Sequence, residues 1–240
     1  MSIITPEIEY VDRSMESIRY LEHGWPSDLC RWHSHREFEL HLIVATRGKA
    51  FVGDYIGEFR PGSLFLTGPY LPHNWVTDEI TSRHVSTRDM LVQFDQESVN
   101  SLSLAFPEFD DMRPMFELAC SGIEFSGFDA KLVQRRLAEI RDSSGPSRIL
   151  AFLQLLVEIN QHAEMRQLSV AAVTQPEDSN KHTRIASVVD HITQHFAEEI
   201  SLETAAELAC MSPTAFSRNF QKITGNRFLE FLNRVRVGQA

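Results

Sequence analysis

Three side chains near the start of the chain have the types and spacing of a metal or effector site. His33, His35 and Glu39 are separated by even numbers of residues in a β-prone stretch, so an extended strand places them on one face. Imidazole nitrogens and a carboxylate oxygen are typical ligands of divalent transition metals. His41 has the same parity and can line the same site. The spacing therefore predicts a polar site on one face of a strand.

Each of these residues also has a structural role open to it. The histidines can hydrogen-bond to loop backbone, and Glu39 can pair with an arginine such as Arg47 or Arg60. Such a pocket can also hold an organic effector, whereas catalysis is the weakest interpretation. A metal, an effector and a structural role thus stay open. The aromatic residues nearby are expected to pack in the core or at the rim rather than to stack on a sugar: Trp32, Phe38, Trp75 and Phe94.

Residues 201–225 have the layout of a second functional element. They predict two short helices joined by a tight turn, a helix-turn-helix, which places its second helix in the DNA major groove. Ser201 can cap the first helix and Ser212 the second, with Pro213 in the first position, where no amide donor is needed. Cys210 lies in the turn, and Gly225 is expected to end the second helix.

The second of these helices has an apolar and a polar face. Phe216, Phe220 and Ile223 recur at spacings of four and three, so they are expected to face the core. On the other face, residues near the helix N-terminus can reach base edges and cations can reach phosphates. The alternative is an ordinary pair of packed helices with a solvated polar face. The predicted DNA-contacting residues are Ser212, Thr214, Ser217, Arg218, Gln221 and Lys222.

Residues 200–240 resemble the first half of the DNA-binding domain of AraC/XylS-type transcription regulators. The resemblance implies a second helix-turn-helix after a linker helix, which residues 228–237 would begin. Because the chain ends there, we expect it to lack this second half and to bind operator DNA weakly or not at all. Cys210 replaces the usual glycine of the turn, so it must tolerate a backbone angle that favours glycine. The resemblance is carried by Ala205, Leu208, Ala209, Met211, Ser212, Phe216, Ser217, Arg218, Phe220, Gly225 and residues 231–236.

The N-terminal motifs resemble those of a cupin barrel, the usual sensor domain of the same family. Residues 33–39, followed by Gly48, match the first motif, and Pro61-Gly62 followed by residues 72–74 matches the second. The resemblance adds His73 to the three residues above and implies that all four point into the mouth of the barrel. It also implies a small-molecule effector, with a sugar among the candidates.

The elements that must position these sites change along the chain. Short β-prone runs with frequent turns fill residues 38–95, which indicates a small antiparallel barrel or sandwich. Helical spacing follows at 115–119, 132–140 and 149–159. The expected fold is α+β, with a cupin effector-binding barrel (1–95), a helical dimerisation segment (96–168), a linker (169–182) and an incomplete helix-turn-helix domain (183–240).

The helix expected over residues 147–160 is apolar on almost every side. One barrel cannot easily cover every side of such a helix, so a partner helix is predicted, and in the family this region pairs two subunits. We therefore expect a homodimer through these residues. A helix fully buried within one chain is the alternative.

Charge and cysteine content limit the partners and the compartment. The chain of 240 residues has a formal net charge of -10, whereas residues 181–240 contain seven Lys and Arg against six Asp and Glu. A DNA-facing surface is therefore expected in this last part. Three well-separated cysteines form no disulfide or zinc pattern, which suits a reducing cytosol. No signal peptide or membrane-spanning run is visible, so a cytoplasmic protein without a membrane partner is expected.

These features together predict an effector-responsive, DNA-binding transcription regulator that is not an enzyme. Its expected partners are DNA, a small-molecule effector and a second copy of the chain. Its candidate cofactor is a divalent transition metal held by His33, His35, Glu39 and His73. Two alternatives stay open: a cupin metalloenzyme with an appended helical domain, which needs a stoichiometric metal, and a protein-interaction module, which predicts no DNA affinity at low salt.

Overall fold

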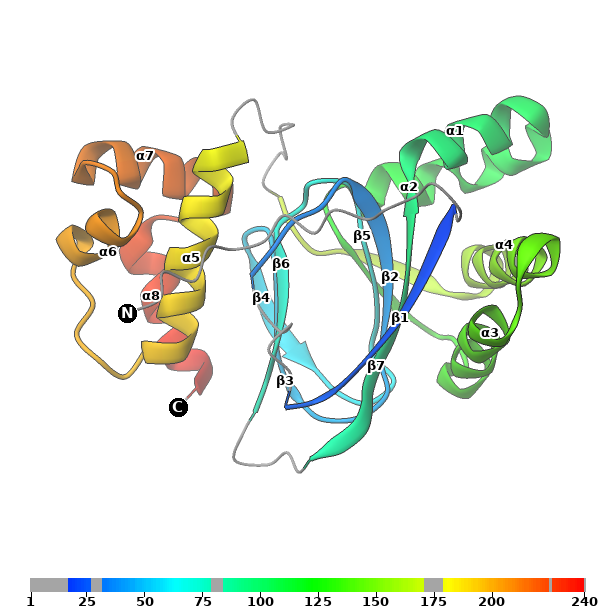
Figure 1. Cartoon of the computed structure of the whole chain (residues 1–240), viewed down its shortest axis with the longest axis horizontal. Coiled ribbons are helices and arrows are strands. Elements are labelled where there is room, and N and C mark those ends of the chain that lie inside the picture. Colours follow the sequence, from blue (N-terminus) through cyan, green and yellow to red (C-terminus); the bar gives the residue numbers. More distant parts are fainter. Residues whose placement is uncertain (1–16, 27–31, 79–83, 171–178, 225, 240) are drawn as a thin grey trace.

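Two antiparallel sheets form the centre of the molecule (Figure 1). The computed structural model describes residues 17–26, 32–78, 84–170, 179–224 and 226–239. Within these residues the larger sheet has the strand order β1-β7-β2-β5-β8-β9 and the smaller has the order β4-β3-β6. The strands are β1 (Ile18–Trp25), β2 (Glu37–Ile43), β3 (Gly48–Val52), β4 (Tyr55–Phe59), β5 (Leu64–Thr67), β6 (His73–Thr77), β7 (Val85–Asp95), β8 (Ile123–Ser126) and β9 (Glu164–Gln167).

The two sheets face each other but do not close into a barrel. The outer edge of β5 pairs with β8, which pairs in turn with β9. In the described part of the chain, an isolated bridge joins His33, ahead of β2, to His73 of the smaller sheet. The expected barrel is therefore not closed, and strands from the segment expected to be helical extend the larger sheet beyond β5. Antiparallel sheets followed by C-terminal helices are confirmed.

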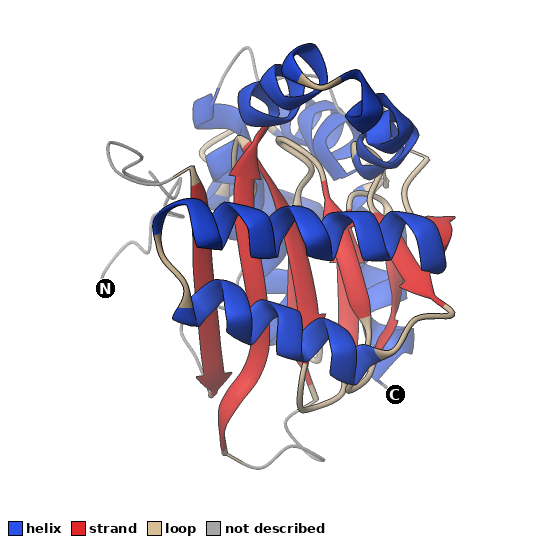
Figure 2. Cartoon of the chain, turned by 90° about the vertical axis from the view of Figure 1, so that its right-hand side faces the viewer, coloured by secondary structure: helices blue, strands red, loops and turns tan. Residues whose placement is uncertain are grey.

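Helices cover both outer sides of the sheets. Figure 1 shows α1 to α4 beside the larger sheet and α5 to α8 beside the smaller one, and Figure 2 shows α3 and α4 across the outer face of the larger sheet. No helix of the described residues is long and apolar enough to cross a membrane. The helices are α1 (Gln96–Ala105), α2 (Arg113–Ala119), α3 (Ala130–Asp142), α4 (Gly145–His162), α5 (Ser179–His195), α6 (Leu202–Leu208), α7 (Pro213–Thr224) and α8 (Phe228–Gln239), with a short 3-10 helix at Pro107–Met112.

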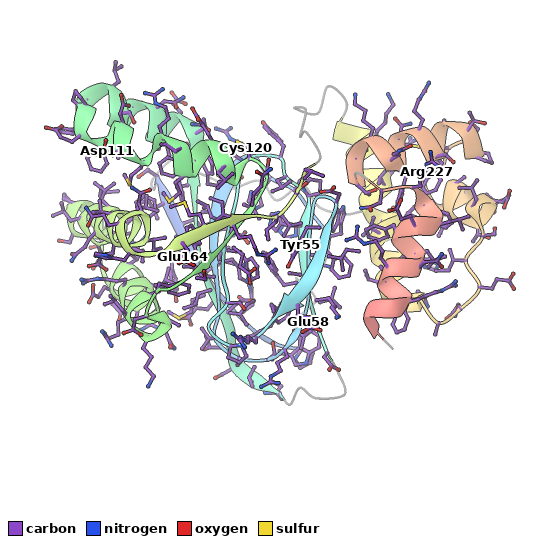
Figure 3. All side chains as sticks on the ribbon, turned by 180° about the vertical axis from the view of Figure 1, so that it is seen from behind. Tyr55, Glu58, Asp111, Cys120, Glu164 and Arg227 are labelled. Carbon is purple, nitrogen blue, oxygen red and sulfur yellow. The ribbon has the colours of Figure 1, made fainter. Side chains whose placement is uncertain are left out.

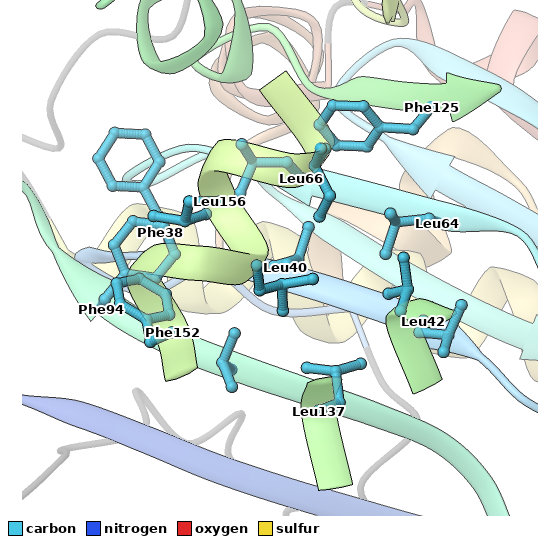
Figure 4. Close-up of a cluster of buried hydrophobic side chains, with 14 of the residues drawn as sticks. Phe38, Leu40, Leu42, Leu64, Leu66, Phe94, Phe125, Leu137, Phe152 and Leu156 are labelled. Carbon is cyan, nitrogen blue, oxygen red and sulfur yellow. The ribbon is translucent and has the colours of Figure 1, made fainter. Parts of the chain in front are cut away.

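Side-chain alternation along β2 gives the larger sheet two different faces. Phe38, Leu40 and Leu42 pack against helices α2 to α4 in the main apolar core (Figure 4). The residues between them point the other way, into the space between the sheets. Glu39 and His41 are therefore only 2% and 3% exposed although both are polar.

Two further apolar cores lie on either side of the smaller sheet. The core between the two sheets contains Phe65 and Trp75, whose ring centroids are 4.4 Å apart. The core of α5 to α8 also contains Trp32 and Phe51, so the C-terminal helices share one core with the outer face of the smaller sheet. The aromatic residues expected to pack in the core or at the rim are all buried: Trp32, Phe38, Trp75 and Phe94.

The segment between the sheets and the C-terminal helices differs in part from its prediction. The helices expected at 115–119, 132–140 and 149–159 are confirmed as parts of α2, α3 and α4, but β8 and β9 were not predicted. Most of the predicted linker, residues 171–178, and Gly225 lie outside the described residues, and α5 begins at Ser179. The division of the chain into four parts stays a prediction.

Helix α4 buries one side and exposes another. Phe152, Leu156 and Ile159 lie in the main core, whereas Leu150 is 67% exposed. The helix is therefore not buried all round within the chain. The homodimer through residues 147–160 stays a prediction.

Candidate functional site

The four predicted ligand residues come together between the two sheets. His33 and His35 precede β2, Glu39 lies in β2, and His73 begins β6. One ligand atom of each residue lies within 4.8 Å of the others. The imidazole rings of His33 and His73 have centroids 4.4 Å apart, and those of His35 and His73 are 5.1 Å apart. The structure thus gathers these side chains in one place, and their role as ligands stays a prediction.

The Glu39 carboxylate is the centre of this cluster. Its Oε2 lies 3.2 Å from His35 Nε2 and accepts a 3.1 Å hydrogen bond from Gln93 Nε2. Its Oε1 lies 2.8 Å from His41 Nδ1 and 3.6 Å from His73 Nε2. Burial alone would raise the pKa of Glu39, but the neighbouring imidazoles of His35, His41 and His73 outweigh burial and hold this pKa well below its usual range. Glu39 is therefore ionised at neutral pH.

Backbone contacts determine how two of the imidazoles present their nitrogens. His35 Nδ1 lies 3.1 Å from the carbonyl oxygen of Glu37, and His73 Nδ1 lies 2.8 Å from that of Leu71. A carbonyl oxygen only accepts, so each Nδ1 carries a proton and donates it. If the ring is neutral, its Nε2 has no proton and directs a lone pair toward the Glu39 carboxylate. The carboxylate is also an acceptor, so neither group can donate a hydrogen bond to the other. A metal ion between these acceptors would satisfy both the Nε2 lone pairs and the carboxylate.

A second buried polar group lies beside Glu39. The Asp89 carboxylate lies 2.8 Å from His23 Nδ1 and 3.3 Å from His41 Nε2, and Arg88 Nη1 is 3.4 Å away. Burial opposes the charge of Asp89, but the nearby cationic groups, His41 first, outweigh it and lower the pKa of Asp89. Burial likewise opposes the charge of His41, but Asp89 and Glu39 raise its pKa to about 9. His41 is therefore a buried imidazolium between two carboxylates.

Sequence reasoning missed Gln93 and Asp89 in this interior. Both lie in β7, where Gln93 pairs with Glu39 and Asp89 pairs with Ile43 across the sheet. Gln93 and Asp89 are four residues apart, so alternation along β7 puts their side chains on the same face of the strand. The pairing of β7 with β2 is needed to show that this face is the one that carries Glu39. The alternative of an arginine partner for Glu39 is not seen, since its partners among the described residues are imidazoles and an amide.

The predicted helix-turn-helix is formed by α6 and α7. Ser201 caps α6, and its hydroxyl oxygen accepts a 3.0 Å hydrogen bond from the backbone of Thr204. Ser212 Oγ accepts a 3.3 Å hydrogen bond from the backbone of Ala215 in the first turn of α7, and α7 begins at Pro213. Both predicted caps are thus present, and each satisfies an amide that the helix itself leaves without an acceptor.

Cys210 adopts the left-handed conformation in the turn between α6 and α7. Its φ is 49°, in the region that favours glycine. The backbone N–H of Met211 donates to the carbonyl of Ala206, and that of Cys210 donates to Glu207. This is the Schellman pattern, which ends a helix by satisfying its last carbonyl groups. The backbone angle expected from the sequence is confirmed.

The two faces of α7 are those predicted. Phe216 and Phe220 are fully buried and Ile223 is partly buried against the same core. The polar face is open to solvent, so it can reach a partner, although contact with DNA stays a prediction. Its residues are Ser212, Thr214, Arg218, Gln221 and Lys222, which are exposed, and Ser217, which is half-buried.

Comparison with known proteins finds similarity to transcription regulators. No protein-family model matches the chain. Over 94 residues it is 31% identical to the HTH-type transcriptional activator RhaS of Enterobacter sp. (strain 638). This match covers 39% of the chain and 30% of the activator, so the chain spans less than a third of that relative. Its similarity to a helix-turn-helix transcriptional activator is thus limited to this region.

Two solved structures resemble the chain only distantly. ToxT from Vibrio cholerae is 10% identical, with a TM-score of 0.37 over 91% of this chain and 98% of ToxT. The AraC-like transcriptional activator CuxR is 13% identical, with a TM-score of 0.29 over 93% of this chain and 73% of CuxR. These scores are too low to establish a common fold, so the functional assignment rests on the site geometry and the RhaS match.

Proposed function

We propose that the chain is an AraC-type, effector-responsive transcription regulator that reads DNA with α7. The observation that carries this proposal is the capped α6–α7 pair, with its apolar face buried and its polar face exposed. The match to the activator RhaS supports the same function. A solvated polar face also occurs in helix pairs that do not bind DNA. The proposal therefore requires that α7 makes contacts with DNA that depend on the base sequence.

Arg218 provides the direct test of DNA reading. A duplex selected from random sequences by the purified chain serves as the probe, and fluorescence anisotropy measures its affinity at fixed salt. Arg218→Ala should weaken binding by about 1–3 kcal/mol if the guanidinium contacts a base with two hydrogen bonds. The control is Arg113→Ala, since Arg113 is exposed on α2 at the other side of the molecule. Equal affinity of both variants would exclude a reading role for Arg218.

The sensor half is proposed to bind its ligand at the cluster of His33, His35, Glu39 and His73. The donor set fits a divalent transition metal, because the Nδ1 contacts of His35 and His73 leave both Nε2 lone pairs directed at an ionised carboxylate. When bound, such a metal would supply a Lewis-acidic position for an oxygen or nitrogen atom of the effector. Thr67 Oγ1 and Gln93 Oε1 are buried without a hydrogen-bond partner in the described structure, and both residues pair with Glu39. They are the groups proposed to contact the polar part of an effector.

Metal analysis of the purified protein tests the sensor proposal. Glu39→Gln removes the carboxylate and keeps its size, so the metal content should fall from about one ion per chain to near zero. Glu58→Gln, at an exposed position of β4, should retain the metal. Equal metal content in the two variants would place the ion elsewhere and would reject this site.

A metal-dependent enzyme is the second candidate function, because the same cluster favours it. That function requires turnover of a substrate by the metal-loaded chain and does not require α7. Arg218→Ala separates the two functions, since it should remove DNA recognition and leave any turnover intact.

A further inference from the structure

Aromatic packing joins the C-terminal helices to the smaller sheet. Phe231 of α8 is fully buried, and its ring centroid lies 6.4 Å from that of Trp32 and 6.2 Å from that of Phe51 in β3. Figure 3 shows β4, marked by Tyr55 and Glu58, on the side of the sheets that faces these helices. Part of the apolar surface of α8 is thus covered by residues of the sensor half.

Hydrogen bonds at the β3–β4 turn reinforce this contact. The carbonyl oxygen of Asp54 accepts a 2.9 Å hydrogen bond from Arg234 Nη1 of α8 and a 3.3 Å hydrogen bond from Asn226 Nδ2. The Asp54 carboxylate accepts hydrogen bonds from Ser169 Oγ at 2.6 Å and from the Val170 backbone at 3.0 Å. One turn therefore holds both α8 and the chain that leaves β9.

The sensor cluster and this interface are neighbours in the sequence. Trp32 immediately precedes His33, and their side chains lie on opposite sides of the backbone, Trp32 against Phe231 and His33 against His73. Backbone hydrogen bonds of 3.1 Å and 2.9 Å between His33 and His73 hold this segment on β6. A shift of the His33 backbone toward the cluster would therefore also displace Trp32 from Phe231.

Metal coordination requires the ligand atoms to move closer together. The four ligand atoms are separated by up to 4.8 Å. Tetrahedral coordination with bonds of about 2.1 Å places ligand atoms only about 3.4 Å apart. Glu39 and His73 belong to strands, whereas His33 is half-buried and lies outside the strands. Coordination displaces Trp32 if His33 is the ligand that moves, together with the part of β6 to which it is hydrogen-bonded. The close-packed contact between Trp32 and Phe231 cannot follow without repacking.

We infer that ligand binding at the cluster and docking of α8 on the smaller sheet oppose each other, with Trp32 as the link between them. This inference rests on the proposed ligand site. Binding at His33 loosens the contact of Trp32 with Phe231, and a docked α8 holds His33 away from the geometry that a metal needs. Linkage makes the effect reciprocal, so a variant with weakened docking binds the metal more tightly.

The test measures Co²⁺ affinity by absorbance titration of the full chain and of two variants. Ile56 of β4 packs against the shared core, so Ile56→Asp weakens docking without touching the cluster. Leu104→Asp, at an exposed position of α1, is the matched control. Ile56→Asp should bind Co²⁺ about fivefold more tightly or better, and Leu104→Asp should bind like the parent. A purely structural role of the interface would predict equal or weaker binding.

Arg234→Ala is the second docking variant, in case Ile56→Asp does not fold. It removes the hydrogen bond to Asp54 from an exposed side chain, and Arg227→Ala, at an exposed position just before α8, is its control. Hydrogen exchange in the parent gives the reciprocal measurement, because Co²⁺ should increase the exchange of residues 228–236. Stoichiometric Co²⁺ binding with equal affinity in all variants would overturn the coupling and leave the site intact. Absence of Co²⁺ binding in the parent would overturn the metal site and the coupling together.

Discussion

Cys210→Gly should stabilise the C-terminal helices. Cys210 has a φ of 49° and an exposed side chain. The left-handed conformation costs a residue with a Cβ about 1–2 kcal/mol. Glycine removes this strain but adds about 0.5–1 kcal/mol of unfolded-state entropy. The two ranges leave a net gain of about 0–1.5 kcal/mol. Its midpoint, about 0.75 kcal/mol, corresponds to a rise in Tm of about 3–6 °C for a folding unit of about 60–100 residues.

Thermal unfolding followed by helical circular dichroism measures this gain. Cys210→Ala is the matched control, because it removes the thiol and keeps the Cβ that causes the strain; it should melt within about 1 °C of the parent. Cys120→Gly should lower Tm, since Cys120 has a φ of -62° at the end of α2, where glycine only adds entropy to the unfolded chain. If Cys210→Gly melted no higher than Cys210→Ala, the account of the turn would be wrong.

Two further predictions concern the cores and pH. Phe220→Ala should lower the free energy of unfolding of the C-terminal helices by about 3–5 kcal/mol, because Phe220 is fully buried. Leu229→Ala, at a position 63% exposed, should lower it by under about 0.5 kcal/mol in urea unfolding. Similar losses in the two variants would mean that the helix faces are misassigned. The pKa of His41 is about 9 in the folded protein, above its value of about 6.5 in the unfolded chain. The stability that protonated His41 gives the fold is therefore fully present below pH 6.5 and is lost as the pH rises through 9. Urea unfolding of the sensor should therefore lose about 3 kcal/mol over this range, and His41→Asn should remove most of that pH dependence; an unchanged profile in this variant would show that other groups cause it.

The elements that could be predicted from the sequence are those specified by neighbouring residues. Ser201 and Ser212 mark the starts of α6 and α7 because a cap acts within three residues. Phe216 and Phe220 are one helical turn apart, so their shared face follows from periodicity. Parity also predicted that His33, His35 and Glu39 lie together, and they do, although His33 and His35 precede β2. These signals are local and survive whatever tertiary contacts surround them.

The remaining features depend on contacts between distant parts of the chain. Strands β8 and β9 are each four residues long and lie between helices, so neither has a period that distinguishes it from a loop. Strand β8 pairs with β5 and β9 pairs with β8, so the two strands extend the larger sheet beyond β5. The proximity of Asp89 to His41 requires the register of β7 on β2. The contact of Trp32 with Phe231 joins two halves of the molecule, and no local pattern in either half predicts it.

The central claim is that α7 reads DNA sequence. The most direct measurement compares the affinity of the purified chain for its selected duplex with that for a scrambled duplex of equal length and composition. Fluorescence anisotropy at about 50 mM salt keeps phosphate contacts strong enough for both to be measured. The account predicts weak binding overall, with the selected duplex bound about tenfold or more tightly than the scrambled one, and it predicts that Arg218→Ala removes most of this preference. Equal affinity for the two duplexes would contradict it.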